Sequence, residues 1–369
     1  MKASTLTRLL GAAVVTFAVT AAYAQPASAS GGDDDHQGSS SSNQVYEATN
    51  DAGGNAIQVF DQASDGTLTV GSLAPTGGLG TGNSLASQGG IARDGRTLLV
   101  VNGGDNTVSS FAITHHGLSL KDVEPSGGLR PVSVTVHDDV VYVLNVGSDA
   151  ITGFRLNDRG DLKPIAGSTR PLSTTGTGAA QVQFNRDGDA LVVTEKATNK
   201  IDTFHVNRRG IVTGATVTDS AGQVPYGFDI DRRDHVIVSE AATGSASSYQ
   251  LDHGQLSTIT GVVVDTQAAP CWLISSPDSR FAFTTNAASG TISSYRVARD
   301  GSLTLLAAVA GTPGAGPTDV ARSSDGGFIF ARVGNGDVAT FAVGHDGSLT
   351  SLGTVTGATS IGSSGLAAS

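Results

Sequence analysis

The chain has 369 residues, of which only 15% are charged, and a formal net charge of −11 at pH 7. An acidic chain without a basic stripe argues against nucleic acid or an anionic membrane as a partner. The single cysteine, Cys271, excludes an intramolecular disulfide, so the stability of the fold must come from packing.

The first 29 residues have the pattern of a secretory signal peptide. Lys2 and Arg8 precede an apolar run at residues 9–22, and small-residue cleavage sites occur at residues 22–24 and 27–29. The apolar run is shorter than the ~20 residues that span a bilayer. We therefore expect a secreted, extracellular protein, whose charge becomes −13 when Lys2 and Arg8 are removed.

Residues 30–43 are rich in glycine, serine and aspartate and cannot bury apolar surface, so a disordered leader is expected there. A metal site at Asp33 to His36 is the alternative to a solvated linker. Residues 44–369 then form one domain, because this length divides into seven units of roughly 47 residues with nothing left for a second domain.

The rest of the chain repeats one unit seven times. The stretch from Phe281 to Leu303 shows it clearly: two β-rich runs separated by a turn, then Asp300-Gly301 and a third apolar run. Copies of the aromatic anchor in the second run are Phe60, Phe111, Phe154, Phe204, Tyr249, Tyr295 and Phe341. The glycine of the following turn recurs in step as Gly66, Gly117, Gly160, Gly210, Gly254, Gly301 and Gly347. A period of about 40 to 50 residues with four short strands predicts an all-β, seven-bladed β-propeller.

The ends of the repeat region predict how the ring closes. The region opens at Val45 with a second-strand sequence, so the first blade lacks its innermost strand. Residues 363–369 match the segments that precede the other copies. We expect this carboxyl-terminal strand to pair into the first blade and remove two exposed edges.

The segments that precede the other copies are the predicted innermost strands. They are residues 86–92, 131–136, 179–184, 225–230, 270–275 and 317–321. Alternating strand direction places the starts of these strands and the ends of the second strands on one face, near the ring axis. A small-molecule site is expected there, at the mouth of the central channel.

Polar residues at this mouth are the candidate site. The second strands end in Asn50, Asn102, Asn145, Glu195, Glu240, Asn286 and Arg332. Near the starts of the inner strands lie Gln88, Ser133, Gln181, Gly227, Trp272 and Asp319. From these, Glu195 and Glu240 are the catalytic candidates, and Gln88, Asn102, Asn145, Gln181, Trp272, Asn286, Asp319 and Arg332 are the candidates for substrate binding. None of the eight histidines falls at this position.

The sequence Val141-Tyr142-Val143-Leu144-Asn145, the Asp-Gly turns and the seven repeats resemble the bacterial seven-bladed propeller lactonases. That family includes the propeller type of 6-phosphogluconolactonase, carboxymuconate cyclases and Tyr-Val-Thr-Asn repeat proteins. The stretches 192–204 and 269–272 are most similar to its secreted actinobacterial members. The resemblance covers residues 44–369 and implies a lactonase acting on a lactone, by hydrolysis or by ring formation.

Family enzymes place arginine and histidine at an inner-strand start and a glutamate at the end of the following strand. Glu195 matches the glutamate, but Ala180 and Gln181 stand where arginine and histidine are expected. Opening a lactone needs a base and a donor for the developing oxyanion. Glu195 or Glu240 could be the base and Arg332 the cation. No cofactor is expected. The alternative is a calcium or magnesium ion bound by the oxygen atoms of Glu195, Glu240, Asp319, Asn102, Asn145 and Asn286.

Each candidate also has a purely structural interpretation. The asparagines would cap the turn between strands two and three, and the glutamates would be rim carboxylates in the same place. Trp272 would pack between blades, and Cys271 would be a small buried residue rather than a nucleophile.

The incomplete catalytic set leaves two functions open. One is a lactonase-like hydrolase that takes a lactone or another small molecule at the channel mouth. The other is a non-catalytic extracellular propeller that binds a ligand or a protein partner.

Overall fold

The computed structural model describes residues 43–357, 362 and 364–369 of the chain. The predicted signal peptide and all but the last residue of the predicted leader lie outside the described residues. Within the described ranges every regular element is a β-strand. No helix there has the length and apolar character needed to cross a membrane.

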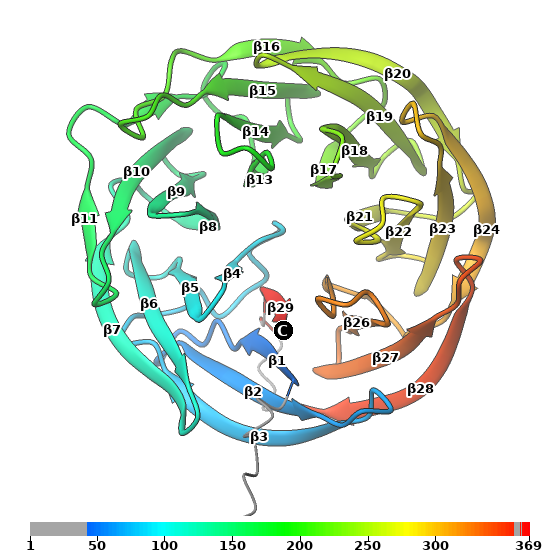
Figure 1. The fold of residues 1–369 in the computed structure, drawn as a ribbon, viewed down its shortest axis with the longest axis horizontal. Helices are drawn as coiled ribbons and strands as arrows, with labels where there is room; N and C mark the ends of the chain where they lie inside the picture. The colour runs from blue at the N-terminus through cyan, green and yellow to red at the C-terminus, as the bar shows by residue number, and fades with distance from the viewer. Residues whose placement is uncertain (1–42, 358–361, 363) are drawn as a thin grey trace, which may run out of the picture. The chain divides into compact units, whose positions relative to one another are not determined.

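Seven antiparallel sheets form the blades of a closed ring, as the repeats predict (Figure 1). Blades one and two, from inside to outside, contain β29 (Leu366–Ala368), β1 (Asn43–Ala48), β2 (Ala56–Gln62) and β3 (Leu68–Pro75), then β4 (Ile91–Asp94), β5 (Thr97–Asn102), β6 (Thr107–Thr114) and β7 (Gly117–Pro125). Blade three contains β8 (Pro131–His137), β9 (Val140–Asn145), β10 (Ala150–Leu156) and a split outer strand, β11 (Leu162–Pro164) and β12 (Arg170–Pro171).

The remaining blades follow the same order. Blades four and five contain β13 (Ala179–Phe184), β14 (Ala190–Glu195), β15 (Lys200–His205) and β16 (Thr216–Asp219), then β17 (Pro225–Ile230), β18 (His235–Glu240), β19 (Ser245–Asp252) and β20 (Gln255–Val264). Blades six and seven contain β21 (Pro270–Ser275), β22 (Phe281–Asn286), β23 (Thr291–Val297) and β24 (Leu303–Gly311), then β25 (Asp319–Arg322), β26 (Phe328–Arg332), β27 (Asp337–Val343) and β28 (Leu349–Thr356).

The carboxyl-terminal strand closes the ring as predicted. Strand β29 pairs antiparallel with β1, with Ala368 opposite Val45 and Leu366 opposite Glu47 (Figure 1). The backbone N–H of Ser369 donates to the carbonyl of Gln44 at 2.9 Å. Blade one is therefore built from both ends of the repeat region, and the backbone groups on the inner edge of β1 pair with β29.

Three inner strands begin later than predicted, and one of them is β29, which begins at Leu366 and not at residue 363. Strand β25 begins at Asp319, two residues later than expected, and β4 begins only at Ile91. The prediction of a strand from residue 86 is wrong because residues 86–90 leave the sheet and extend to the ring axis (Figure 1).

The blades contact one another through the turn between their two outer strands. All seven anchor aromatics are buried, and all seven turn glycines have a positive φ. The turn carbonyl accepts a hydrogen bond from the preceding blade: Ser248 Oγ donates to Gly301 at 2.8 Å, and Tyr142 Oη donates to Gly210 at 2.6 Å. The turn glycine thus combines a backbone conformation that favours glycine with a close approach to the neighbouring blade.

Gly301→Ala tests this contact. The residue has a φ of +82°, and an added Cβ would lie 2.5 Å from Ile259 Cδ1 and 2.7 Å from His235 Cδ2. We expect the substitution to lower the free energy of unfolding by about 2–4 kcal/mol, because backbone strain and a blade-to-blade clash combine. Chemical denaturation measures the change.

Gly95→Ala is the matched control, since Gly95 has a φ of +52° but nothing within 4 Å of the added Cβ. Strain alone should cost about 1 kcal/mol there. Equal losses in the two variants would contradict the importance of the blade contact.

Candidate functional site

The strand register brings the predicted site positions to one face of the ring. In five of the seven blades the second strand ends opposite the start of its inner strand: Asn145 faces Pro131, Glu195 faces Ala179, and Asn286 faces Pro270. The same holds for Glu240 with Pro225 and for Arg332 with Asp319. The side chains at these positions are all buried, so their partners decide what chemistry they can perform.

The asparagines hold the turn between the second and third strands. Asn102 Nδ2 donates to Thr107 Oγ1 at 3.0 Å and to Ser109 Oγ at 2.8 Å. Asn286 Nδ2 repeats this pattern with Thr291 and Ser293 at the same two distances. This is the capping geometry of the structural interpretation. A role for Asn102, Asn145 and Asn286 in substrate binding stays a prediction.

Glu195 takes the asparagine position in blade four and lies in a closed hydrogen-bond network. Its Oε2 accepts from Ser173 Oγ at 2.6 Å and from Thr198 Oγ1 at 2.5 Å, and its Oε1 accepts from the Ser173 backbone N–H at 3.1 Å. Asp202 Oδ2 accepts from the same N–H at 2.9 Å. Burial first, and then the neighbouring Glu195, raise the pKa of Asp202 to about 8.

Glu240 occupies the equivalent position in blade five, but one of its oxygens is unused. Oε1 lies 2.6 Å from Ser220 Oγ and 2.7 Å from Ser247 Oγ, and both hydroxyls donate to it. Oε2 has no hydrogen-bond partner among the described residues. Burial raises the pKa of the Glu240 carboxyl above its ordinary value, against the opposing effect of the Ser220 and Ser247 hydroxyls, the Gly222 backbone N–H and the Tyr249 hydroxyl.

Gln88 ties several blades together at the ring axis. Its backbone N–H donates to Ala180 of blade four at 3.1 Å. Its side-chain amide donates to the Leu273 carbonyl at 2.7 Å and accepts from the Leu273 N–H at 2.9 Å, as a neighbouring strand would. Trp272 Nε1 donates to Ser87 at 2.8 Å, so the predicted tryptophan also contacts this segment. Residues 86–90 therefore occupy the axis where a channel mouth is expected.

The other predicted residues near the axis also form contacts within the protein. Gln181 uses its amide in the same way as Gln88, bonding both backbone groups of Phe228. Asp319 Oδ2 accepts from the Gly365 N–H at 2.9 Å, and burial raises its pKa to about 7. Arg332 forms a buried ion pair with Glu47 of blade one, at 3.0 Å between Nε and Oε1. Their roles in ligand binding stay predictions.

Lys196 is a residue of the mouth that the sequence reasoning missed. It directly follows Glu195, and its amine reaches the axis, where it donates to the Ala86 carbonyl at 2.6 Å and lies 4.7 Å from the centre of the Tyr226 ring. Trp272 packs edge-on against Tyr226, with ring centres 5.2 Å apart. Burial lowers the pKa of the Lys196 amine to about 8. The adjacency to Glu195 was the only available signal, and it does not reveal the side chain's direction.

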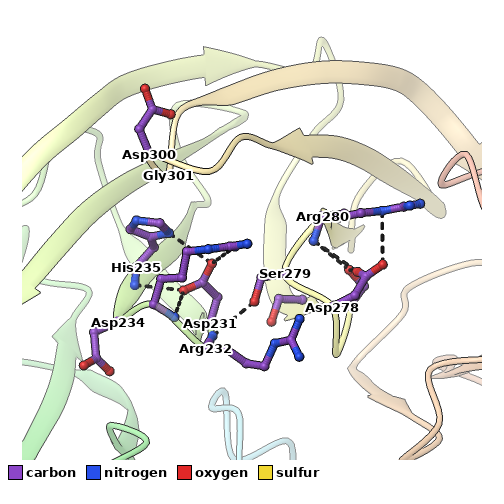
Figure 2. Close-up of polar contacts among 12 residues, drawn as sticks. Asp231, Arg232, Asp234, His235, Asp278, Ser279, Arg280, Asp300 and Gly301 are labelled. Atoms are coloured by element: carbon purple, nitrogen blue, oxygen red, sulfur yellow. Dashed lines mark hydrogen bonds and ion pairs between the residues drawn. The ribbon is translucent and has the colours of Figure 1, made fainter.

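The opposite rim carries a second polar cluster, shown in Figure 2. His235 Nδ1 lies 3.0 Å from Asp231 Oδ2, and both side chains are buried. The imidazole packs under Gly301, as Phe281 packs under Gly347 in the next blade contact. The His235 and Asp231 pair therefore belongs to the blade-to-blade packing described above.

The comparison with known proteins identifies the family. A family model described as lactonase, 7-bladed beta-propeller, matches residues 53–170, 164–264 and 239–365. The chain belongs to this family of seven-bladed propeller lactonases. No curated protein matches the sequence.

Solved structures of low identity share the fold of this lactonase-family chain. A protein from Lactobacillus plantarum is 17% identical with a TM-score of 0.74, covering 89% of this chain and 99% of the other. The periplasmic gluconolactonase of Pseudomonas aeruginosa is 17% identical with a TM-score of 0.70 and the same coverage. A candidate 6-phosphogluconolactonase from Bacteroides fragilis is 18% identical, with a TM-score of 0.68 and coverage of 90% and 99%.

The structure shows where the two residues lie at which this chain differs from the expected family pattern. Ala180 and Gln181, which stand where the resemblance led us to expect arginine and histidine, lie beside the axis, with the Ala180 carbonyl bonded to Gln88. Among the described residues, no three histidine, cysteine, aspartate or glutamate side chains gather to hold a metal ion. The predicted oxygen ligands come from different blades, and calcium or magnesium binding by them stays a prediction.

Asp202→Asn should stabilise the protein most at alkaline pH. Because the folded-state pKa of Asp202 is raised, the folded protein retains a proton that the unfolded chain loses, and stability falls as pH rises from about 4 to 8. The amide removes this loss. We expect a gain of roughly 2 kcal/mol at pH 8 and little change at pH 4, measured by urea unfolding.

Asp187→Asn, an exposed aspartate of the same blade, is the control and should leave the pH profile unchanged. A variant at Asp202 that is destabilised equally at both pH values would show that the carboxyl is needed as an acceptor only.

Proposed function

We propose that this lactonase-family propeller binds a small acidic molecule or lactone at the axis and does not open the lactone. The observation that carries the proposal is the opposite direction of two adjacent side chains. Glu195 contacts Ser173 and Thr198, whereas Lys196 contacts Ala86 and Tyr226 at the axis. The cation is presented near the mouth, and the predicted base is buried away from it.

The chemistry of the mouth suits an anionic or carbonyl-bearing ligand. A lysine amine binds a carboxylate or a lactone carbonyl oxygen as a point charge with three donors. Tyr226 and Trp272 provide a rigid apolar wall beside it. Water activation needs a base within hydrogen-bond reach of the bound carbonyl, and the contacts of Glu195 and Glu240 are all internal.

Lactone opening is the second candidate, because Lys196 lies where it could stabilise an oxyanion. Secretion supports neither candidate over the other; we propose it from the basic and apolar pattern of residues 1–29. A protein partner at this face is a further alternative that the binding measurements below address.

Lys196→Met tests the proposal by removing the charge and keeping the length of the side chain. Binding of D-gluconate and of D-glucono-δ-lactone is measured by calorimetry, and ring opening is followed by proton release in a pH-stat. We expect binding to the wild type, at least tenfold weaker binding to the variant, and no ring opening above the spontaneous rate. Lys163→Met, at an exposed position of blade three, should bind normally.

Ring opening that disappears in Lys196→Met would establish lactone hydrolysis in place of binding alone. Absence of binding to both ligands would contradict both candidates and favour a protein partner.

A further inference from the structure

An open hollow of ≈ 770 Å³ lies on the same face but between the loops of blades four and five. It is lined by the turn that follows β14, the segment from β16 to β17, the turn that follows β18, and part of β20. Its lining includes Asn199, Ser220, Gly222, Gln223 and Thr243, and none of the residues predicted from the sequence as site residues. The lining also contains none of Lys196, Tyr226 and Trp272, so the hollow is separate from the group around Lys196.

Apart from Asp219, the polar side chains of the lining are hydrogen-bond donors and acceptors that carry no charge. Asn199 Oδ1 accepts from the Val224 N–H at 2.8 Å, and within the described ranges its amide nitrogen has no acceptor. Thr243 Oγ1 accepts from the Gln223 N–H at 2.8 Å, which leaves its hydroxyl proton for a ligand. The Gln223 side chain is exposed and offers both ends of its amide.

The wall of the hollow covers the Glu240 carboxyl, whose Oε2 has no hydrogen-bond partner among the described residues. Ser220 and Gly222 line the hollow and cover this carboxyl: an added Cβ on Gly222 would lie 2.6 Å from Glu240 Cγ. Ser220 donates its proton to Glu240 Oε1 and lies 3.3 Å from Tyr249 Oη, so its hydroxyl oxygen accepts from Tyr249 and has one lone pair left for a ligand. Glu195, the equivalent residue in blade four, has both oxygens bonded, whereas Glu240 Oε2 has no partner in the described part of the chain. The Glu240 carboxyl is buried with spare acceptor capacity behind a wall that has no side chain at Gly222.

The chemistry of the lining selects one class of ligand. The charged residue of the lining, Asp219, is paired with Lys200, and no lysine or arginine lines the hollow to attract an anion. The apolar contribution is limited to small side chains and Val262, which gives an apolar peptide little to bury. Amides and hydroxyls that both donate and accept match the hydroxyl groups of a neutral sugar.

We propose that this hollow is a second ligand site, which binds a neutral saccharide through Asn199, Gln223 and Thr243, with Ser220 held as an acceptor by Glu240. The site lies beside the axis and uses no residue of the Lys196 group.

Neutral hexasaccharides of β-1,4-linked glucose, β-1,4-linked N-acetylglucosamine and α-1,6-linked mannose are the probes, measured against the full chain by saturation-transfer NMR and calorimetry. Asn199→Asp keeps the acceptor for Val224 and removes the donor, and Gln223→Ala removes a side chain that is exposed. We expect at least one hexasaccharide to bind, and each substitution to weaken it at least tenfold. Gln255→Ala, at the exposed first residue of β20, and Lys196→Met should bind it as the wild type does.

Three outcomes would overturn the proposal: no hexasaccharide binds, binding survives in both Asn199→Asp and Gln223→Ala, or binding is lost in Lys196→Met. The last outcome would place the saccharide at the axis. Because the axis proposal is tested with acidic ligands and lactones, either proposal can fail while the other stands.

Discussion

The fold depends on the contact between each outer hairpin turn and the preceding blade. A four-stranded sheet of this size cannot bury both faces by itself, so the ring is stable only if neighbouring blades pack closely. The turn glycine permits this, because its carbonyl accepts from donors such as Ser248 and Tyr142, and its missing side chain lets the preceding blade approach. His235 under Gly301 shows that even a buried ionisable residue can serve this packing.

A second repeated arrangement explains why the mouth of the ring is so polar. At the end of each second strand, a polar side chain secures the following turn and meets a residue of the loop arriving from the previous blade. Thr76 reaches Asn102 in this way, Ser173 reaches Glu195, and Ser220 reaches Glu240. The residue at the end of the second strand therefore has a structural role in the blade. In the adjacent blades four and five this residue is a glutamate, Glu195 or Glu240, which adds a charge. Burial is the main reason that the pKa values of Glu240 and of Asp202, which lies beside Glu195, are raised.

The architecture could be predicted from the sequence because its signals are local and repeated. The aromatic anchors and turn glycines recur in step, and the missing first strand implied the closure that β29 provides. The register between neighbouring strands also followed, which is why Glu195 and Glu240 were placed on the correct face. The candidate site was harder, because spacing fixes where a backbone position lies and leaves the direction of its side chain open. Lys196 points to the axis and Glu195 into the blade, although they are adjacent. Gln88 and Leu273 are 185 residues apart, and no repeat pattern predicts their contact.

The amide of Gln88 gives this repeat protein a property that its repeats alone would not. In a repeat array whose units contact only their neighbours, the folding and unfolding of one unit depends only on that unit and on its two neighbours. Here one side chain from the loop before blade two substitutes for a strand partner on blade six, beside Gly227 of blade five, where any larger residue would exclude it. During synthesis this amide has no partner until the sixth unit has been made. The side-chain hydrogen bonds of Gln88 at the centre of the ring can therefore form only after β21 has been synthesised, later than the contacts between the earlier blades.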